Sequence, residues 1–112
     1  MLRMLGLVLC FGLLATVSAS AATHPFSVHD MLAMERISDP RVSPDGRLVA
    51  FTVRATDLDA NKGRNDLYVA AVDGTSQRRL TTSDASDTQP RWAPDGSALF
   101  FVSTRSGSAQ VW

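Results

Sequence analysis

The sequence predicts an all-β fold built from repeated units, and two observations lead to this prediction. The segment PRVSPDGRLVAF at Pro40 returns as PRWAPDGSALFF at Pro90, with six identities in twelve positions at an offset of 50 residues. In both copies, short runs of β-forming residues alternate with turns that contain Gly, Pro and Asp. Short strands separated by frequent turn signals are typical of many-stranded β structure.

The first residues have the pattern of an export signal. Arg3 is the only charged residue before an apolar run over 5–17, and small residues follow at 18–22. These are the n-region, h-region and cleavage site of a secretory signal peptide. The run has 13 residues, whereas a transmembrane helix needs roughly 20. We therefore predict a signal peptide over 1–21, cleaved before Ala22 or, alternatively, before Thr23.

The composition of the mature chain excludes several classes of function. Cys10 lies inside the predicted signal peptide after the bulky Leu9, which argues against lipoprotein processing. The remaining chain has no cysteine, so it has neither a disulfide framework nor a thiol nucleophile. Its net charge of −1 recruits neither nucleic acid nor an anionic membrane. We expect a periplasmic or extracellular protein with no nucleic-acid partner and no stable membrane anchor after cleavage.

One short helix is predicted before the repeats, within an N-terminal segment over 22–39. Ser27 can cap its N-terminus, and Asp30 completes a capping box three residues later. Apolar residues then follow at close to helical spacing. These residues are Val28, Met31, Leu32 and Ile37. The helix is expected to end before Pro40.

The repeats predict the blades of a propeller. Blade 1 is expected over 40–81, with strands at 40–43, 47–54, 66–72 and 77–81. After a linker at 82–88, a partial blade 2 is expected over 89–112, with strands at 89–93, 97–104 and 109–112. The loop between the second and third strands is six residues longer in blade 1, and without it the period is about 44 residues. Four-stranded blades repeat at roughly 40 to 45 residues.

The predicted fold class is therefore all-β, an incomplete β-propeller of about one and a half four-stranded blades after a signal peptide and a short N-terminal helix. A hairpin-rich sandwich that reuses one turn is the alternative. At Pro44-Asp45-Gly46 the fixed φ of proline suits the second position of a type I turn, and the glycine supplies a left-handed bulge residue. Pro94-Asp95-Gly96 repeats this turn, and Asp73-Gly74 forms a related one.

The candidate chemical motifs are all incomplete. Residues 57–63 begin like a calcium loop, but Lys62 and Tyr68 occupy the places of its glycine and its bidentate glutamate. His24 and His29 are the only histidines, and they have no metal-ligand spacing. A G-x-S-x-G motif is absent as well. The sequence predicts no catalytic, cofactor-binding or metal-binding residue, and no cofactor, in this chain.

A family resemblance is found in three stretches of the sequence. These stretches are SPDGRLVAF, DLYVAAVDGTSQRRLT and PRWAPDGSALFFVSTRSGSAQVW. They resemble the propeller repeat of secreted bacterial serine peptidases of the prolyl oligopeptidase family, in the acylaminoacyl peptidase and dipeptidyl peptidase branch. The lead-in FSVHDMLAMERISDPRVSPDG is similar to the short helix before the first blade of that group. The propeller of the Tol system has a similar repeat, so a non-enzymatic periplasmic scaffold or binding protein is the alternative.

The peptidase resemblance implies an activity that resides outside these residues. In that family a C-terminal α/β-hydrolase domain carries a Ser, Asp, His triad, and the propeller gates the access of peptide substrates. No triad residue can be assigned to a position in this chain. We therefore expect an N-terminal fragment of a peptidase that is inactive alone. A small protein whose open blades assemble with other copies is a further alternative.

Overall fold

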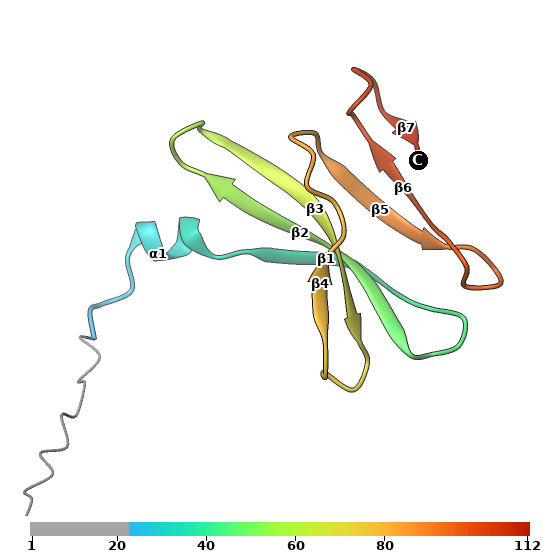
Figure 1. Ribbon diagram of the computed structural model, residues 1–112. Helices are drawn as coiled ribbons and strands as arrows, with labels where there is room; N and C mark the ends of the chain where they lie inside the picture. The colour runs from blue at the N-terminus through green and yellow to red at the C-terminus, as the bar shows by residue number, and fades with distance from the viewer. Residues whose placement is uncertain (1–22) are drawn as a thin grey trace, which may run out of the picture.

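The computed structural model describes residues 23–112, so the predicted signal peptide lies outside the described residues. Two antiparallel sheets follow each other along the chain (Figure 1). Sheet 1 has the strand order β1-β2-β3-β4, and sheet 2 has the order β5-β6-β7. The strands are β1 (Arg36–Val42), β2 (Leu48–Asp57), β3 (Lys62–Ala71), β4 (Gln77–Arg79), β5 (Asp87–Trp92), β6 (Leu99–Ser103) and β7 (Gln110–Val111). The predicted fold of one full and one partial four-stranded blade is confirmed.

The N-terminal helix, α1 (Val28–Ala33), begins as predicted and ends earlier. The Ser27 N–H donates to Asp30 Oδ2 at 2.7 Å, and the capping box is complete. Met34 then has an extended backbone, with φ −68° and ψ 125°. The assignment of Ile37 to the helix was wrong, because this residue lies in β1 and pairs with β2. A helix this short is only marginally stable by itself. The residues that follow it therefore pair with β2 instead of extending the helix.

Two strands also begin earlier than predicted. β1 begins at Arg36 rather than at Pro40, and β5 begins at Asp87 inside the predicted linker over 82–88. In both places the strand pairs with its neighbour before the proline, and the pairing resumes after the proline. The prolines stand in bulges, where the pairing register shifts and no N–H is needed. The residue before each proline is left-handed, with φ 49° at Asp39 and φ 56° at Gln89.

The predicted turn geometry is confirmed in both repeats. The N–H groups of Gly46 and Gly96 each donate to the carbonyl three residues earlier at 2.9 Å, and both glycines have φ +73°. Gly74 closes the related turn with φ +78°. Gly107 closes a turn of the same kind that was not predicted, with φ +96°. A positive φ carries little steric penalty only in glycine.

The extra residues of the first repeat lengthen a hairpin instead of forming a long loop. β2 and β3 pair without interruption from Leu48 and Ala71 to Asp57 and Lys62. The turn is short because Asp57 Oδ1 accepts the Ala60 N–H at 2.9 Å and Asn61 is left-handed at φ 48°. The prediction of a loop between residues 54 and 66 was therefore wrong, because most of these residues belong to the paired strands β2 and β3.

The two sheets pack through β5, which crosses β1, β2 and β3. We call the side of a sheet that points toward the following sheet its forward face, and the opposite side its rear face. Because strand residues alternate between faces, the forward face of sheet 1 carries Ala50, Thr52 and Leu67, all of which are buried. The rear face of sheet 2 carries Leu99 and Phe101, which line a cavity together with Leu67.

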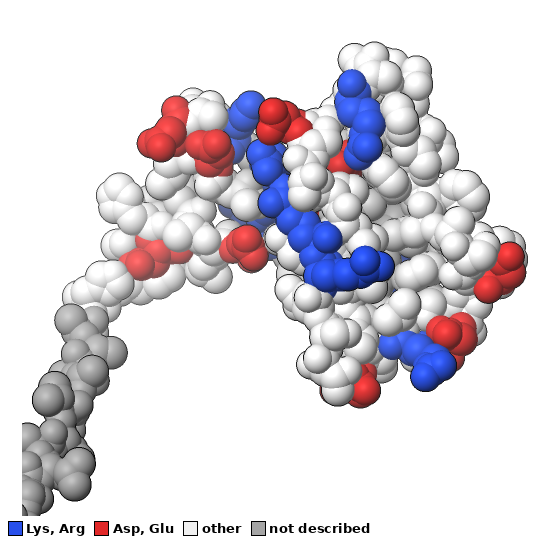
Figure 2. All heavy atoms as spheres, in the orientation of Figure 1, with Lys and Arg blue, Asp and Glu red and all other residues white. Residues whose placement is uncertain are grey.

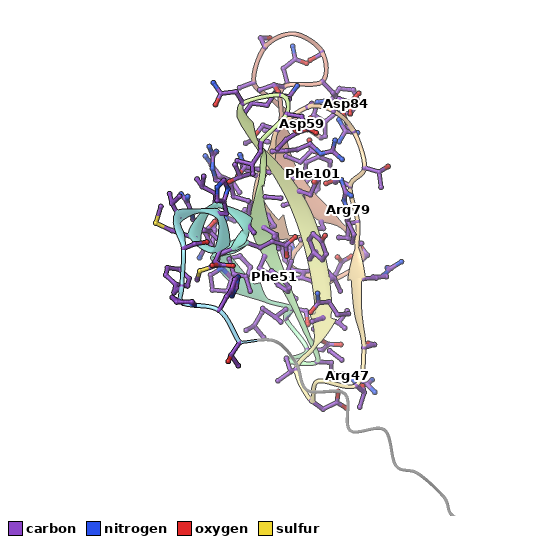
Figure 3. All side chains as sticks on the ribbon, turned by 90° about the vertical axis from the view of Figure 1, so that its left-hand side faces the viewer. Arg47, Phe51, Asp59, Arg79, Asp84 and Phe101 are labelled. Carbon is purple, nitrogen blue, oxygen red and sulfur yellow. The ribbon has the colours of Figure 1, made fainter. Side chains whose placement is uncertain are left out.

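The rear face of sheet 1 carries a second apolar group. Phe51 and Tyr68 are opposite each other on β2 and β3, with ring centroids 6.0 Å apart. Phe51 and Val53 are both buried. Helix α1 lies against β2, and Figure 3 shows Phe51 on the side of the sheet where α1 passes.

Candidate functional site

A cavity of about 420 Å³ lies between the two sheets. One wall comes from β3 of sheet 1 and the chain after β4, and it consists of Leu67, Leu80, Thr81, Thr82 and Ser83. The other wall comes from β6 of sheet 2 and the turn after it, and it consists of Leu99, Phe101 and Arg105. The lining is mixed, with four apolar side chains, three residues that carry hydroxyl groups and one arginine. β5 lies against β1, β2 and β3, and β6 lies on the other side of β5 from sheet 1 (Figure 1).

The arginine of this cavity is held by four contacts. Arg105 Nη2 donates to Asp87 Oδ2 at 2.9 Å, and its Nε donates to Ser103 Oγ at 2.9 Å. Its guanidinium lies 5.2 Å from the ring centroid of Phe101 and 5.1 Å from that of Trp112. Both Asp87 and Ser103 are fully buried. Because a buried carboxylate requires a partner, Arg105 is a structural part of sheet 2.

Sheet 1 has a different polar cluster, at the junction of β3 and β4. Asp66 is buried and accepts from Arg79 Nη2 at 2.8 Å and from Arg64 Nε at 3.4 Å. Thr81 Oγ1 accepts the Leu67 N–H at 3.0 Å and continues the ladder beyond β4 with its side chain. The hydrogen bond to Asp66 raises the pKa of Arg79. Figure 3 labels Arg79 at this edge of the molecule.

Two hydrogen bonds connect the inner strands of the sheets. Trp92 Nε1 donates to the carbonyl of Arg41 at 2.8 Å, and Arg91 Nη1 donates to Asp39 Oδ2 at 2.8 Å. The second bond is the main cause of a lowered pKa at Asp39. The left-handed backbone of Asp39 places its carboxylate between Arg41 and Arg91. The bulge therefore serves to connect the blades.

The predicted absence of catalytic residues is not tested by these contacts, but the described residues show where the candidates lie. His24 Nε2 is 3.3 Å from Asp30 Oδ1 beside α1. Within residues 23–112, no hydrogen bond joins a serine to a histidine, and no group of three or more His, Cys, Asp or Glu side chains gathers. The arrangement can join sheets and enclose a cavity, and we assign it no bond-breaking chemistry.

Basic side chains form a band across the face shown in Figure 2, over β3 and β4. These strands carry Lys62, Arg64, Arg78 and Arg79. The band is partly neutralised, because Asp66 pairs with two of these arginines and Asp84 lies 3.2 Å from Arg64. No helix among residues 23–112 has the length and apolar character to cross a membrane.

The residues that sequence reasoning missed are Asp87 and Arg105. Their counterparts 50 residues earlier are Ile37 and Ala55. An acid and a base thus replace two apolar residues together in the second repeat. That paired change is the signal in the sequence for the ion pair between Asp87 and Arg105.

Comparison with known proteins places this architecture in a family. The family model described as the TolB beta propeller domain matches residues 28–112. The chain belongs to this TolB propeller family. The match includes α1 and all seven strands, so both polar clusters and the cavity lie within the matched residues.

Relatives of this propeller region include named peptidases. The chain is 30% identical over 80 residues to dipeptidyl-peptidase 5 of Porphyromonas gingivalis and 28% identical over 81 residues to that of Porphyromonas endodontalis. It is 28% identical over 80 residues to the uncharacterized peptidase YuxL of Bacillus subtilis. These alignments cover 71–72% of the chain but only 12% of each relative. The chain is thus similar to a propeller region of peptidases, and it spans a small part of their length.

Proposed function

We propose that the chain is the N-terminal propeller portion of an exported serine peptidase of the prolyl oligopeptidase family, in the acylaminoacyl peptidase and dipeptidyl peptidase branch. The observation that carries the proposal is the similarity of this TolB-type region to dipeptidyl-peptidases. The contacts of the described residues that support it are those that join the two sheets in the manner of neighbouring blades. The peptide-bond chemistry then belongs to an α/β-hydrolase domain outside the 112 residues.

In this proposal the propeller controls which peptides reach the catalytic domain. The hydrogen bonds from Trp92 to Arg41 and from Arg91 to Asp39 hold the inner strands of two sheets together. A stiff connection between sheets keeps any opening narrow, so long peptides are excluded more than short ones. The substrates of the complete enzyme are peptides.

The test compares two substrates with the complete gene product. Trp92→Ala removes the indole from between the sheets, and we expect kcat/KM for a peptide of about 30 residues to rise several-fold while that for a chromogenic dipeptide stays constant. Leu58→Ala at the exposed β2–β3 turn is the control and should change neither value. A parallel change for both substrates contradicts the gating role.

Export has its own test. We propose cleavage before Ala22 or Thr23, and N-terminal sequencing of the product recovered from the periplasm or medium identifies the first residue. A product that still begins at Met1 contradicts export.

The description of the matching family model favours one second candidate, a non-enzymatic propeller scaffold like that of the Tol system. Reading the gene beyond codon 112 separates the two. A continuing frame with more repeats and then a G-x-S-x-G motif supports the peptidase, whereas further repeats without a hydrolase domain support the scaffold.

A further inference from the structure

Two arginines and one carboxylate converge where the first strands of the two sheets meet. Arg41 Nη2 lies 2.7 Å from Asp39 Oδ1, and Arg91 Nη1 donates to Asp39 Oδ2 at 2.8 Å. Asp39 and Arg41 belong to β1, whereas Arg91 belongs to β5. Each of these strands forms one edge of its sheet, and the two strands pack against each other. We call these three residues the inner-edge cluster.

The strands that carry this cluster are the inner strands of a propeller. Blades are arranged around a central channel, so the edges at which neighbouring sheets approach each other lie next to that channel. β1 is in contact with β5, whereas among residues 23–112 the strand at the opposite edge of sheet 1, β4, has no contact with a strand of sheet 2. A ligand that enters such a channel therefore meets β1 and β5 before the outer strands.

Both guanidinium groups are accessible although the sheets are packed. Arg41 is opposite Ala50, so it lies on the forward face of sheet 1, where sheet 2 is already in place. Even so, 46% of the Arg41 side chain is exposed, and the value for Arg91 is 50%. The exposure of Arg41 is thus a property of a position between two packed blades, and its charge is available to a ligand.

The inner-edge cluster also has more hydrogen-bond donors than it uses. A guanidinium has five N–H donors. Arg41 directs Nε and Nη2 at Asp39. Arg91 Nη1 donates to Asp39 and to the Pro90 carbonyl, the latter at 2.7 Å. Among the described residues, Arg41 Nη1 and the Nε and Nη2 of Arg91 have no acceptor. Two positive charges against one negative charge leave the cluster positive.

Comparison of the two repeats indicates that the arginine does more than pair with an acid. Arg41 and Arg91 are equivalent residues in the two repeats, but the equivalent of Asp39 is Gln89. Gln89 keeps the left-handed backbone, with φ 56° against 49° at Asp39, and it carries no charge. The positive charge is therefore present in both repeats, whereas the negative charge is present in one. This pattern favours an anionic ligand over a purely structural ion pair.

We propose that the inner-edge cluster binds a carboxylate group of a peptide. Guanidinium groups match the geometry of carboxylates and bind them by charge-assisted hydrogen bonds. The carboxylate belongs to an aspartate or glutamate side chain or to the C-terminus of the peptide. That the ligand is a peptide rests on the proposed function, whereas the preference for a carboxylate rests on the cluster itself.

The test measures peptide binding by calorimetric titration of the complete gene product. Treatment with a fluorophosphonate, which blocks a reactive serine, first prevents a serine peptidase from cleaving the probe. The probe is the peptide Ala-Glu-Ala-Glu-Ala, and two matched peptides have either Gln in place of Glu or an amidated C-terminus. We expect one of the matched peptides to bind about fivefold to tenfold more weakly than the probe, and that peptide identifies the source of the carboxylate.

Three variants connect the effect with the inner-edge cluster. Arg41→Gln and Arg91→Gln each remove one guanidinium and should weaken binding of the probe about fivefold to tenfold. Asp39→Asn removes the negative charge, keeps a residue that tolerates the left-handed backbone, and should tighten binding. A purely structural role of Asp39 does not produce this gain. Arg78→Gln, at an exposed position on β4, is the control for the loss of one positive charge and should leave binding unchanged.

Several results overturn the proposal. Equal affinity for the three peptides, or no detectable binding of the probe, contradicts a carboxylate site. Unchanged binding in both arginine variants, with folding verified by circular dichroism, contradicts the assigned residues. Weaker binding in Asp39→Asn shows that the cluster is only structural.

Turnover of a chromogenic dipeptide by the untreated product is measured separately and reports on the peptidase proposal. If the product turns over the dipeptide but has no preference for carboxylates, only the carboxylate site is wrong. If binding depends on the carboxylate and on the two arginines but turnover is absent, the site is supported and the peptidase proposal is wrong.

Discussion

The two repeats have the same turns and bulges but different side chains on one face. Each has a left-handed residue before a bulged proline and a glycine turn with the same φ. On the rear face, however, sheet 1 has the exposed Ile37 and the half-buried Ala55, where sheet 2 has the buried Asp87 and its partner Arg105. The comparison teaches that turn and bulge residues specify the blade, whereas these rear-face positions accept either two apolar residues or an ion pair.

The largest loss of stability is expected from breaking the ion pair between Asp87 and Arg105. Arg105→Ala leaves Asp87 as a fully buried carboxylate without its guanidinium. We expect the free energy of unfolding to fall by about 3 to 5 kcal/mol, the usual loss when one partner of a buried pair is removed. Urea unfolding followed by circular dichroism measures the change.

The double variant Asp87→Ile and Arg105→Ala copies the residues of sheet 1 and removes both charges. It should recover more than half of the stability lost in Arg105→Ala, because no buried charge remains unpaired. Losses that simply add in the double variant would show that the pair is not coupled and that the residues of the first repeat cannot replace it.

A smaller effect is expected at the contact between the sheets. Trp92→Phe retains an aromatic ring but removes the Nε1 donor to the Arg41 carbonyl. The expected loss in the free energy of unfolding is about 1 kcal/mol. Trp92→Val, which copies Val42 of the first repeat, should lose more because it also removes buried ring area. Equal losses in the two variants contradict the role of the ring.

A gain in the free energy of unfolding, of similar size, is expected from one substitution on the forward face of sheet 1. Thr52 Oγ1 is buried without a hydrogen-bond partner, and the equivalent residue in sheet 2 is Val102. Thr52→Val should raise the free energy of unfolding by about 1 kcal/mol, because it removes an unsatisfied polar group with little change in shape. Thr56→Val, on the same face but only half-buried, is the control and should change stability by less than about 0.5 kcal/mol. A destabilised Thr52→Val variant indicates a required hydroxyl.

The smallest effects concern the carboxylates of the two equivalent turns. The Ser43 hydroxyl is the main cause of a lowered pKa at Asp45, and the Ser97 hydroxyl plays that part at Asp95. A carboxyl with a folded pKa below the ordinary value of 3.8 stabilises the fold above that pH, and this stabilisation is lost as the pH falls below it. Lowering the pH below about 4 should therefore lower the unfolding midpoint.

Titration of the carboxyl carbons by NMR separates the two turns. Ser43→Ala should raise the pKa of Asp45 toward 3.8 and leave that of Asp95 unchanged, and Ser97→Ala should do the reverse. If both pKa values move in either variant, the turns are electrostatically coupled and the local explanation is wrong.

Local sequence signals predicted the parts of the fold that depend on backbone conformation. Capping at Ser27 and the glycine turns follow from a few neighbouring residues, and the structure confirms them. Strand ends were less predictable, because Arg36 and Lys62 join strands only through partners on another segment. The Asp87–Arg105 pair joins residues that are 18 positions apart, and neither residue forms a local motif.

The aromatic residues are distributed unevenly between the sheets. The chain has two tryptophans and one tyrosine. Trp92 ends β5 and Trp112 follows β7, so both belong to sheet 2, whereas Tyr68 belongs to sheet 1. Tryptophan emission thus reports on sheet 2 and on its contact with sheet 1, while far-ultraviolet dichroism reports on both sheets. Without any added label, the molecule can reveal whether its blades melt together or one at a time.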